Sequence, residues 1–260
     1  MIYRTVLYLF ATVSIFSSCT DLIEYSPFDT GVHSRSLNLA YADCIASKVM
    51  SGDTLRIAYF SDSHSYFDHL NSAVSRINRR GRTSFAISGG DVADAGLAYQ
   101  YKAYIDVIEK CAVPVFTTIG NHDYRSNGEI LFKRLFGPTN SSFVYGDYKF
   151  IFFDDVVWEN GNGRPDFDWL EQQISDTTYS NILIAHIMPG DEQLEGEFAD
   201  LFARIVTVEN TLLCLHGHAH GFSDSYFNGI RSIIPGRVKR RSYCEISLVG
   251  KEIILENIAF

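Results

Sequence analysis

The segment LRIAYFSDSH, residues 55–64, begins as an apolar run and ends as a polar one. A short apolar run that stops at polar, turn-forming residues is typical of a buried strand. Asp62 and His64 follow this expected strand directly and stand two residues apart. Where the backbone turns, side chains with this spacing can reach one centre. The segment therefore indicates a polar site at the carboxyl end of a strand.

The same pattern recurs twice further along the chain. The apolar runs and the polar groups that end them are 85–88 with Gly89-Gly90-Asp91 and 113–119 with Gly120-Asn121-His122-Asp123. Between these runs, segments 67–77 and 99–111 have apolar residues at helical spacing. Alternating strands and helices favour a largely parallel sheet, in which ligands bind beyond the carboxyl ends of the strands. The sequence thus predicts an α/β fold with its site at that edge.

The second half of the chain is richer in expected strands. We expect a hairpin over 142–154, helices over 167–174 and 195–206, and short strands from residue 222 onward. Two further strands, 181–185 and 212–215, end at His186 and at the group His216-Gly217-His218-Ala219-His220. The polar residues at 162–164 form a loop that could border the site. No internal repeat or domain linker is visible.

Seven side chains at these strand ends have the chemistry of ligands for divalent metals. They are Asp62, His64, Asp91, Asn121, His186, His218 and His220. Taken singly, such an Asp is usually a turn or cap residue, and such a His is usually a hydrogen-bonded structural residue. Taken together they are harder to explain in this way. Four of the seven are histidines, and with His122 they make five of the eight histidines in the chain.

The ordered set of these motifs resembles the calcineurin-like metallophosphoesterase family over roughly residues 54–258. The resemblance implies a two-sheet β-sandwich flanked by helices, with the site at the strand ends. It also implies that Asp62, His64, Asp91 and His220 hold a first metal ion, and that Asn121, His186 and His218 hold a second. Asp91 would bridge the two ions. His122 matches the family's catalytic His, and the adjacent Asp123 could orient it.

The implied activity is hydrolysis of a small phosphorylated substrate, a phosphomonoester or a phosphodiester, by a dinuclear metal centre. The two divalent ions, of which Fe, Mn, Zn and Mg all suit these ligands, would generate a bridging hydroxide. Three alternatives stay open. They are a pyrophosphatase for nucleotide or lipid substrates, an inactive surface-anchored binding protein of the same fold, and a single structural zinc site, which needs only four ligands.

Three further features have two interpretations each. His216 is either a structural residue or part of the surroundings of the site, rather than a ligand. Asp94 either supports the loop after Asp91 or caps a helix. The basic cluster of Arg237, Lys239, Arg240 and Arg241 either binds an anionic substrate or forms a solvated face.

The N-terminal segment is expected to direct export. An apolar run over 6–16 is about half the length that a membrane-spanning helix needs, so a signal peptide over 1–18 is the better interpretation. Cys19, after two serines, resembles the lipidated residue of a bacterial lipoprotein. We therefore expect an exported lipoprotein, anchored in a membrane at Cys19 and facing the periplasm or the cell surface. Residues 19–53 would form a tether and extended segment, and 54–260 the enzymatic domain.

Composition sets two further limits. The net charge of −9 argues against nucleic acid as a stable partner, because such binding needs a basic field. Four cysteines besides Cys19 stand far apart, with no pair at metal-site spacing. Buried thiols are the favoured interpretation, and disulfides remain possible for an exported chain.

Overall fold

The computed structural model describes residues 26, 28–46 and 52–260. The expected signal peptide and the lipidation site Cys19 lie outside these residues. Within the described part of the chain, no helix is long and apolar enough to cross a membrane.

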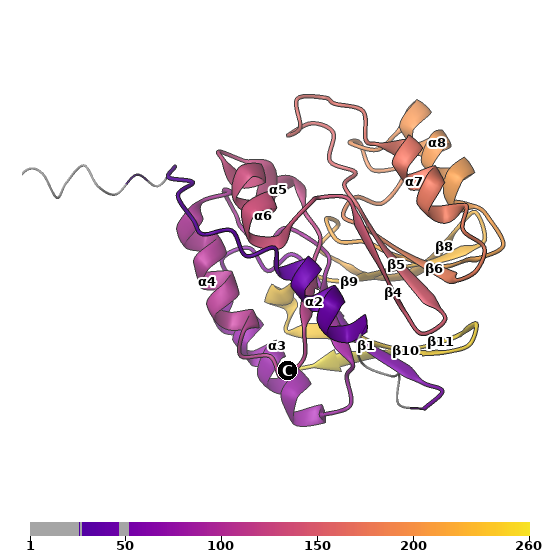
Figure 1. Ribbon diagram of the computed structural model, residues 1–260, viewed down its shortest axis with the longest axis horizontal. Coiled ribbons are helices and arrows are strands. Elements are labelled where there is room, and N and C mark those ends of the chain that lie inside the picture. Colours follow the sequence, from indigo (N-terminus) through magenta and orange to yellow (C-terminus); the bar gives the residue numbers. More distant parts are fainter. Residues whose placement is uncertain (1–25, 27, 47–51) are drawn as a thin grey trace, which may run out of the picture.

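Two sheets face each other, and helices cover their outer faces (Figure 1). The first sheet has the order β11-β10-β1-β2-β3 and the second the order β4-β5-β6-β7-β9-β8. The strands of the first sheet are β1 (Leu55–Phe60), β2 (Phe85–Ser88), β3 (Val115–Thr117), β10 (Ser242–Val249) and β11 (Glu252–Ala259). Those of the second are β4 (Ser141–Tyr145), β5 (Tyr148–Phe153), β6 (Ser180–Ala185), β7 (Thr211–Leu215), β8 (Phe222–Phe227) and β9 (Ile230–Pro235).

The central strands of each sheet are parallel. In the first sheet β1, β2 and β3 run parallel, and the C-terminal hairpin β10–β11 joins β1 in antiparallel register. In the second, β5, β6, β7 and β9 run parallel, with β4 and β8 antiparallel at the two edges. The carboxyl ends of the parallel strands therefore gather at one edge of each sheet, as the sequence predicts.

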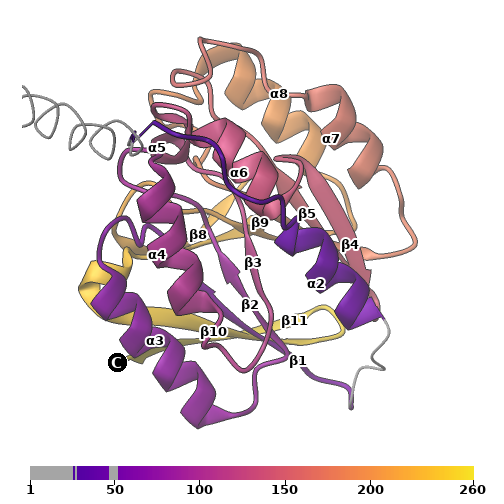
Figure 2. The same cartoon turned by 60° about the vertical axis from the view of Figure 1, so that its left-hand side comes forward.

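The helices lie on the outer faces of both sheets, as Figure 2 shows from a second side. Their bounds are α2 (Leu37–Ala46), α3 (Phe67–Arg80), α4 (Ala98–Ile108), α5 (Asn121–Tyr124), α6 (Gly128–Phe136), α7 (Phe167–Ile174), α8 (Gly196–Val206) and the 3-10 turn η1 (Val238–Arg240). The helices α3 and α4 cover the first sheet, and α7 and α8 cover the second.

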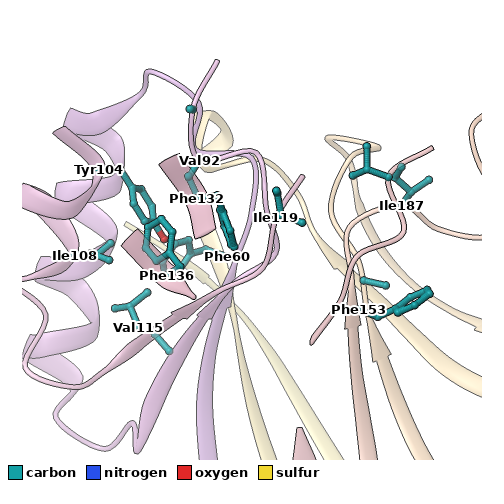
Figure 3. Packing of buried hydrophobic residues seen from close by; sticks show 14 of the residues in the cluster. Phe60, Val92, Tyr104, Ile108, Val115, Ile119, Phe132, Phe136, Phe153 and Ile187 are labelled. Carbon is teal, nitrogen blue, oxygen red and sulfur yellow. The ribbon is translucent and has the colours of Figure 1, made fainter. Parts of the chain in front are cut away.

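Side-chain alternation along the strands creates two buried layers. From β1, Ile57 and Tyr59 point between the sheets, where they meet β5 residues such as Phe150. Ala58 and Phe60 point to the other face, toward the helices. Figure 3 shows Phe60 beside helix residues such as Tyr104 and Phe136, with Phe153 and Ile187 further away at the second sheet. Strand β1 is thus buried on both faces, as are β2 and β5, which explains their largely apolar sequences.

Helix α2 differs from the extended segment expected within residues 19–53. Leu37, Tyr41 and Ile45 recur every fourth residue, so they form one short apolar stripe on the helix. Tyr41 packs edge-to-face on Phe116 of β3, with ring centroids 6.0 Å apart. The helix therefore depends on a strand more than seventy residues away, and the local pattern alone is too short to predict it.

Asn38 of α2 also closes an exposed strand edge. Its Nδ2 donates to the Thr117 carbonyl at 2.8 Å, and its Oδ1 accepts from the Thr117 N–H at 3.0 Å. Because β3 is the edge strand of the first sheet, these main-chain groups have no neighbouring strand on that side. The Asn38 side chain takes the place of that strand and holds α2 against the sheet.

The described cysteines other than Cys44 form no disulfide. Cys214 and Cys244 are buried, and Cys111 is partly buried. This agrees with the expectation of buried thiols. Burial raises the pKa of both Cys214 and Cys244 to about 12, so these thiols stay protonated and act as small apolar side chains.

Candidate metal centre

The predicted site residues meet where the ends of the two sheets approach each other. Main-chain hydrogen bonds join the loops that carry them. Asp62 N donates to Gly90 O at 3.1 Å, which joins the loops after β1 and β2. Gly217 N donates to His186 O at 2.9 Å, which joins the loops after β6 and β7. His186 Nδ1 lies 2.6 Å from Gly89 O, which joins the two pairs of loops into one hydrogen-bonded rim.

Asp91 lies at the middle of this rim and is buried. Its Oδ2 is 3.7 Å from Nε2 of His64, and its Oδ1 is 3.4 Å from Nε2 of His186. The same Oδ1 accepts the His122 main-chain N–H at 2.8 Å. One carboxylate therefore faces a histidine from each sheet.

Three overlapping groups of ligand atoms surround Asp91, each within 4.8 Å of one another. The groups are Asp62 with His64 and His220, His64 with Asp91 and His122, and Asp91 with His186 and His218. Asn121 joins the last group, because its Oδ1 is 3.1 Å from Nδ1 of His218. The structure thus brings together all seven residues predicted as ligands, and His122 with them.

The backbone at these residues is strained. Ten described residues other than glycine have positive φ, and half of them are Asp62, His64, Asp91, His218 and His220, with φ of 43–60°. L-residues avoid this left-handed region, and such strain is found mainly at functional sites. Both two-residue spacings, Asp62 to His64 and His218 to His220, use it to turn alternate side chains toward one centre.

Gly120 leaves the space that Asp91 occupies. A Cβ added at Gly120 would lie 2.3 Å from Asp91 Oδ1 and 2.4 Å from Asp91 N. Both distances are far below van der Waals contact, and one of these atoms belongs to the backbone. The glycine before Asn121 is therefore required by the close approach of two loops, in addition to ending the strand.

Burial sets the protonation of most of the histidines. It lowers the pKa of His64 to about 4, and it also lowers those of His218 and His220. Neutral imidazoles carry the lone pair that a metal ion needs. Burial alone would also lower the pKa of His186, but the Asp91 carboxylate reverses this and raises it to about 10. A cation that binds beside Asp91 would have to replace the proton on His186.

The cluster also contains buried polar atoms without hydrogen-bond partners. They are Asp62 Oδ2, His64 Nδ1 and His186 Nε2, all among the described residues. Buried polar atoms of this kind are rare because each loses its hydration without compensation. Coordination to a cation would satisfy such atoms, and carboxylate, imidazole and amide groups suit divalent Fe, Mn, Zn and Mg. The donor set therefore fits divalent metal ions.

The His122 ring faces Asp94 rather than Asp123. His122 Nδ1 is 2.8 Å from the Asp94 carbonyl and 3.5 Å from its Oδ1. A carbonyl only accepts, so Nδ1 of His122 carries a hydrogen. The Asp94 carboxylate also lies 3.5 Å from His64 Nδ1. Asp94 is thus a residue of the site, and supporting the loop after Asp91 is the better of its two interpretations.

Asp123 does not have the orienting role expected from its position beside His122. Its two carboxylate oxygens accept main-chain N–H groups of Val92, Ala93 and Gly120. The side chain is buried and clamps the loop after β2 to the start of α5. Burial and the nearby Asp91 charge raise its pKa to about 7. The correction has a simple reason, since adjacent residues in a helix point in different directions.

Two acidic residues at the rim have no signal among the strand-end motifs. Glu159, from the loop that includes 162–164, accepts a hydrogen bond of 2.7 Å from Nδ2 of Asn121. Asp191, from the loop after β6, has its Oδ2 3.5 Å from Nε2 of His218. Both carboxylates border the group of Asp91, His186 and His218. The polar loop over 162–164 was the only hint of Glu159 in the sequence.

His216 lies apart from the ligand groups. Its buried ring has Nδ1 3.0 Å from the Ala185 carbonyl and packs against Phe202. Burial lowers its pKa to about 4, so the ring is neutral. The structural interpretation of His216 is therefore the better one.

Two facing sheets carry an Asp/His cluster at their strand ends. The protein is therefore of the α/β class, with a donor set that fits divalent metal ions. The family model of calcineurin-like phosphoesterases matches residues 55–222. The chain belongs to this family, which confirms the family and the two-sheet fold predicted from the sequence. A search of curated proteins by sequence gives no match.

Solved structures with this fold include proteins of different roles. The purple acid phosphatase PPD1 from yellow lupin seeds is 13% identical over 82% of this chain and 52% of that one, with a TM-score of 0.63. GAP50, described as the anchor in the inner membrane complex of Plasmodium, is 16% identical over 80% and 85%, with a TM-score of 0.60. The protein TT1561 of Thermus thermophilus is 16% identical over 78% and 99%, with a TM-score of 0.57. At these identities the likeness is one of fold.

Proposed function

We propose that this protein is a hydrolase that cleaves small phosphoric esters with two divalent metal ions. The position of Asp91 carries the proposal, because its two oxygens face His64 on one side and His186 on the other. A carboxylate with ligand groups on both sides is the arrangement that a pair of metal ions needs.

Each ion would have its own set of ligands. Asp62, His64, Asp91 and His220 would hold the first ion, and Asp91, Asn121, His186 and His218 the second. Support comes from Asp62, His64 and His220, and from Asp91, His186 and His218, whose ligand atoms lie within 4.8 Å of one another in each of the two trios. Asn121 Oδ1 lies 3.1 Å from Nδ1 of His218. Bound here, two divalent ions would supply Lewis-acid activation of water and neutralise the charge of the phosphoryl oxygens.

The chain's own residues would position the ester and manage protons. His122 lies at the edge of the cluster, next to His64, with ring centroids 4.6 Å apart. The Asp94 carbonyl accepts the hydrogen of Nδ1, so His122 would give a proton to the leaving oxygen from Nε2 when the ring is in its imidazolium form. The buried Asp123 would keep Asp91 and His122 in register through the main chain.

The alternative of an inactive anchored protein keeps one supporting observation. GAP50 has this fold and is described as an anchor. Against it, the present chain retains every predicted ligand and His122 in one cluster. We therefore place hydrolysis first. Pyrophosphate cleavage in nucleotide or lipid substrates would use the same centre.

The test is to strip the purified protein of metal and restore Fe, Mn, Zn or Mg separately. Hydrolysis of a chromogenic phosphomonoester and phosphodiester is then followed for wild type, Asp91→Asn and His122→Ala. His33→Ala, an exposed histidine outside the cluster, is the control. We expect metal-dependent turnover that Asp91→Asn abolishes, that His122→Ala lowers strongly and that His33→Ala leaves intact. Two bound ions without turnover on either ester would favour the anchored binding protein.

We also propose that the protein is exported and anchored through a lipid on Cys19. The support is the short apolar run before this cysteine. Cells fed an alkyne-tagged fatty acid should label the wild-type chain and leave Cys19→Ala unlabelled. Labelling that persists in Cys19→Ala would rule out this attachment site.

A further inference from the structure

The segment after β9 fixes Arg237 beside the candidate metal centre. Arg237 N donates to the His220 carbonyl at 3.2 Å, and Val238 N donates to the Ser61 carbonyl at 3.1 Å. Ser61 and Arg237 also form an isolated parallel bridge. Arg237 is therefore held between the loop that carries Asp62 and the loop that carries His220.

The four residues of the basic cluster have different surroundings in the structure. Lys239 lies over the Tyr66 ring, with its Nζ 4.8 Å from the centroid. Arg241 donates from Nε to the Phe260 carbonyl at 3.0 Å. Arg240 is exposed on the 3-10 turn. Arg237 alone of the four is partly buried against a predicted metal ligand, so the cluster is not a uniform solvated face.

The Arg237 guanidinium has no ion-pair partner in the described part of the chain. Its Nε is buried and makes no hydrogen bond there. By contrast, Arg80 pairs with Glu245 and Arg231 pairs with Asp224, both at 2.8 Å. A desolvated cationic donor without an acceptor is unfavourable. The neighbouring His220 side chain is 41% exposed, so a ligand at the centre can reach this region.

Carboxylates lie at other points around the centre. Glu159 and Asp191 lie against Asn121 and His218, at the group assigned to the second ion. The Asp94 carboxylate lies 3.5 Å from His64 Nδ1 of the first group. An additional anionic group would be repelled by these carboxylates and attracted by Arg237. The charges thus define one direction in which a substrate with two anionic groups would lie.

We propose that Arg237 binds a second anionic group of the substrate, a carboxylate or a phosphate, next to the ester phosphate that is cleaved. The preferred substrates would then be phosphoric esters whose leaving group is itself anionic. Arg is suited to this role because its planar guanidinium binds carboxylate and phosphate through two parallel hydrogen bonds. This inference rests on the proposed function, in which the ester phosphate binds at the two metal ions.

Two small probes distinguish binding of the second anionic group from binding of the phosphate. Phosphoglycolate carries a phosphate and a carboxylate, and methyl phosphate carries the phosphate alone. Titration calorimetry on the metal-loaded protein measures their dissociation constants without requiring turnover. We expect wild type to bind phosphoglycolate about 10–100-fold more tightly, as one charge-assisted pair allows. Arg237→Gln should abolish this preference and leave methyl phosphate binding unchanged.

Arg240→Gln is the matched control, because it removes the same charge from an exposed position of the same segment. Arg237→Lys should keep part of the preference. Metal stoichiometry and thermal unfolding of each variant check that the centre and the fold are intact. Equal binding of both probes by wild type would overturn the proposal. So would equal weakening of both probes in Arg237→Gln, or the same loss in Arg240→Gln.

Failure of the Arg237 subsite and failure of the proposed hydrolysis give different results. An Arg237-dependent preference for phosphoglycolate in a protein without turnover would support the subsite and reject the hydrolase. Turnover of simple esters without any preference would support the hydrolase and reject the subsite.

Discussion

Glu159 fixes which way the Asn121 amide faces. Its carboxylate accepts from Nδ2 of Asn121 at 2.7 Å, and a carboxylate cannot donate in return. The amide oxygen is therefore turned the other way, where it lies 3.1 Å from His218 Nδ1. This is the orientation that a metal ligand needs, since the oxygen carries the lone pairs.

Glu159→Ala should weaken binding of the second ion. Without its acceptor the Asn121 amide is free to rotate, and loss of such a supporting hydrogen bond typically lowers metal affinity about 10–100-fold. Titration calorimetry should show one site weakened and one unchanged. Glu159→Gln, which still offers a carbonyl oxygen, should lose less. Two unchanged sites in both variants would show that Glu159 does not hold the amide.

Gly120→Ala should disrupt the whole centre. The new Cβ would overlap Asp91, whose side chain faces both sets of ligands. We expect loss of both ions and a lower melting temperature. Gly221→Ala is the control, because the nearest atom to a Cβ there is 3.8 Å away. A Gly120→Ala protein that still binds two ions would mean that the two loops can move apart.

Asp94→Asn should affect turnover much less than His122→Ala. The His122 ring is held by the main-chain carbonyl of Asp94, and the carboxylate is 3.5 Å away and 58% exposed. We expect about a 100- to 10,000-fold lower kcat for His122→Ala, the usual range for a general acid, and a loss below about tenfold for Asp94→Asn. Similar losses in the two variants would assign the orientation of His122 to the Asp94 side chain.

Glu245 should make the fold sensitive to acid. Burial tends to raise its pKa, but hydrogen bonds from Arg80 and Arg82 outweigh this and lower it. A carboxylate with a lowered pKa stabilises the fold above the unfolded value of 4.5, and this contribution is lost as the pH falls through the folded value. Glu245→Gln should be less stable at neutral pH by roughly 1.5–3 kcal/mol, as for a hydrogen bond to a charged group.

The same variant should lose less further stability than wild type does as the pH falls below 4.5. Urea unfolding of the two proteins across this range measures the difference. Parallel curves would show that Glu245 does not titrate differently in the folded and unfolded states.

Local pattern was sufficient for the central strands and for the residues with ligand chemistry at their ends. A short, largely apolar run such as Leu55–Phe60 is typical of a buried strand, and the polar residues that end it lie at the sheet edge. Helix α2 shows the opposite case. Its stripe of Leu37, Tyr41 and Ile45 is too short to form a helix without β3 beside it.

The sequence by itself determined the set of residues with ligand chemistry, because each stands at the end of a short segment that is typical of a strand. The ordered set of these motifs carried the resemblance to the family, and the two-sheet architecture followed from that resemblance. Only the tertiary structure decided how these residues relate to one another. It gave Asp123 a clamping role, placed Asp94 at His122, and put Glu159 beside Asn121 and Arg237 beside His220. These relationships depend on loops from two different sheets, so no spacing within one segment contains them.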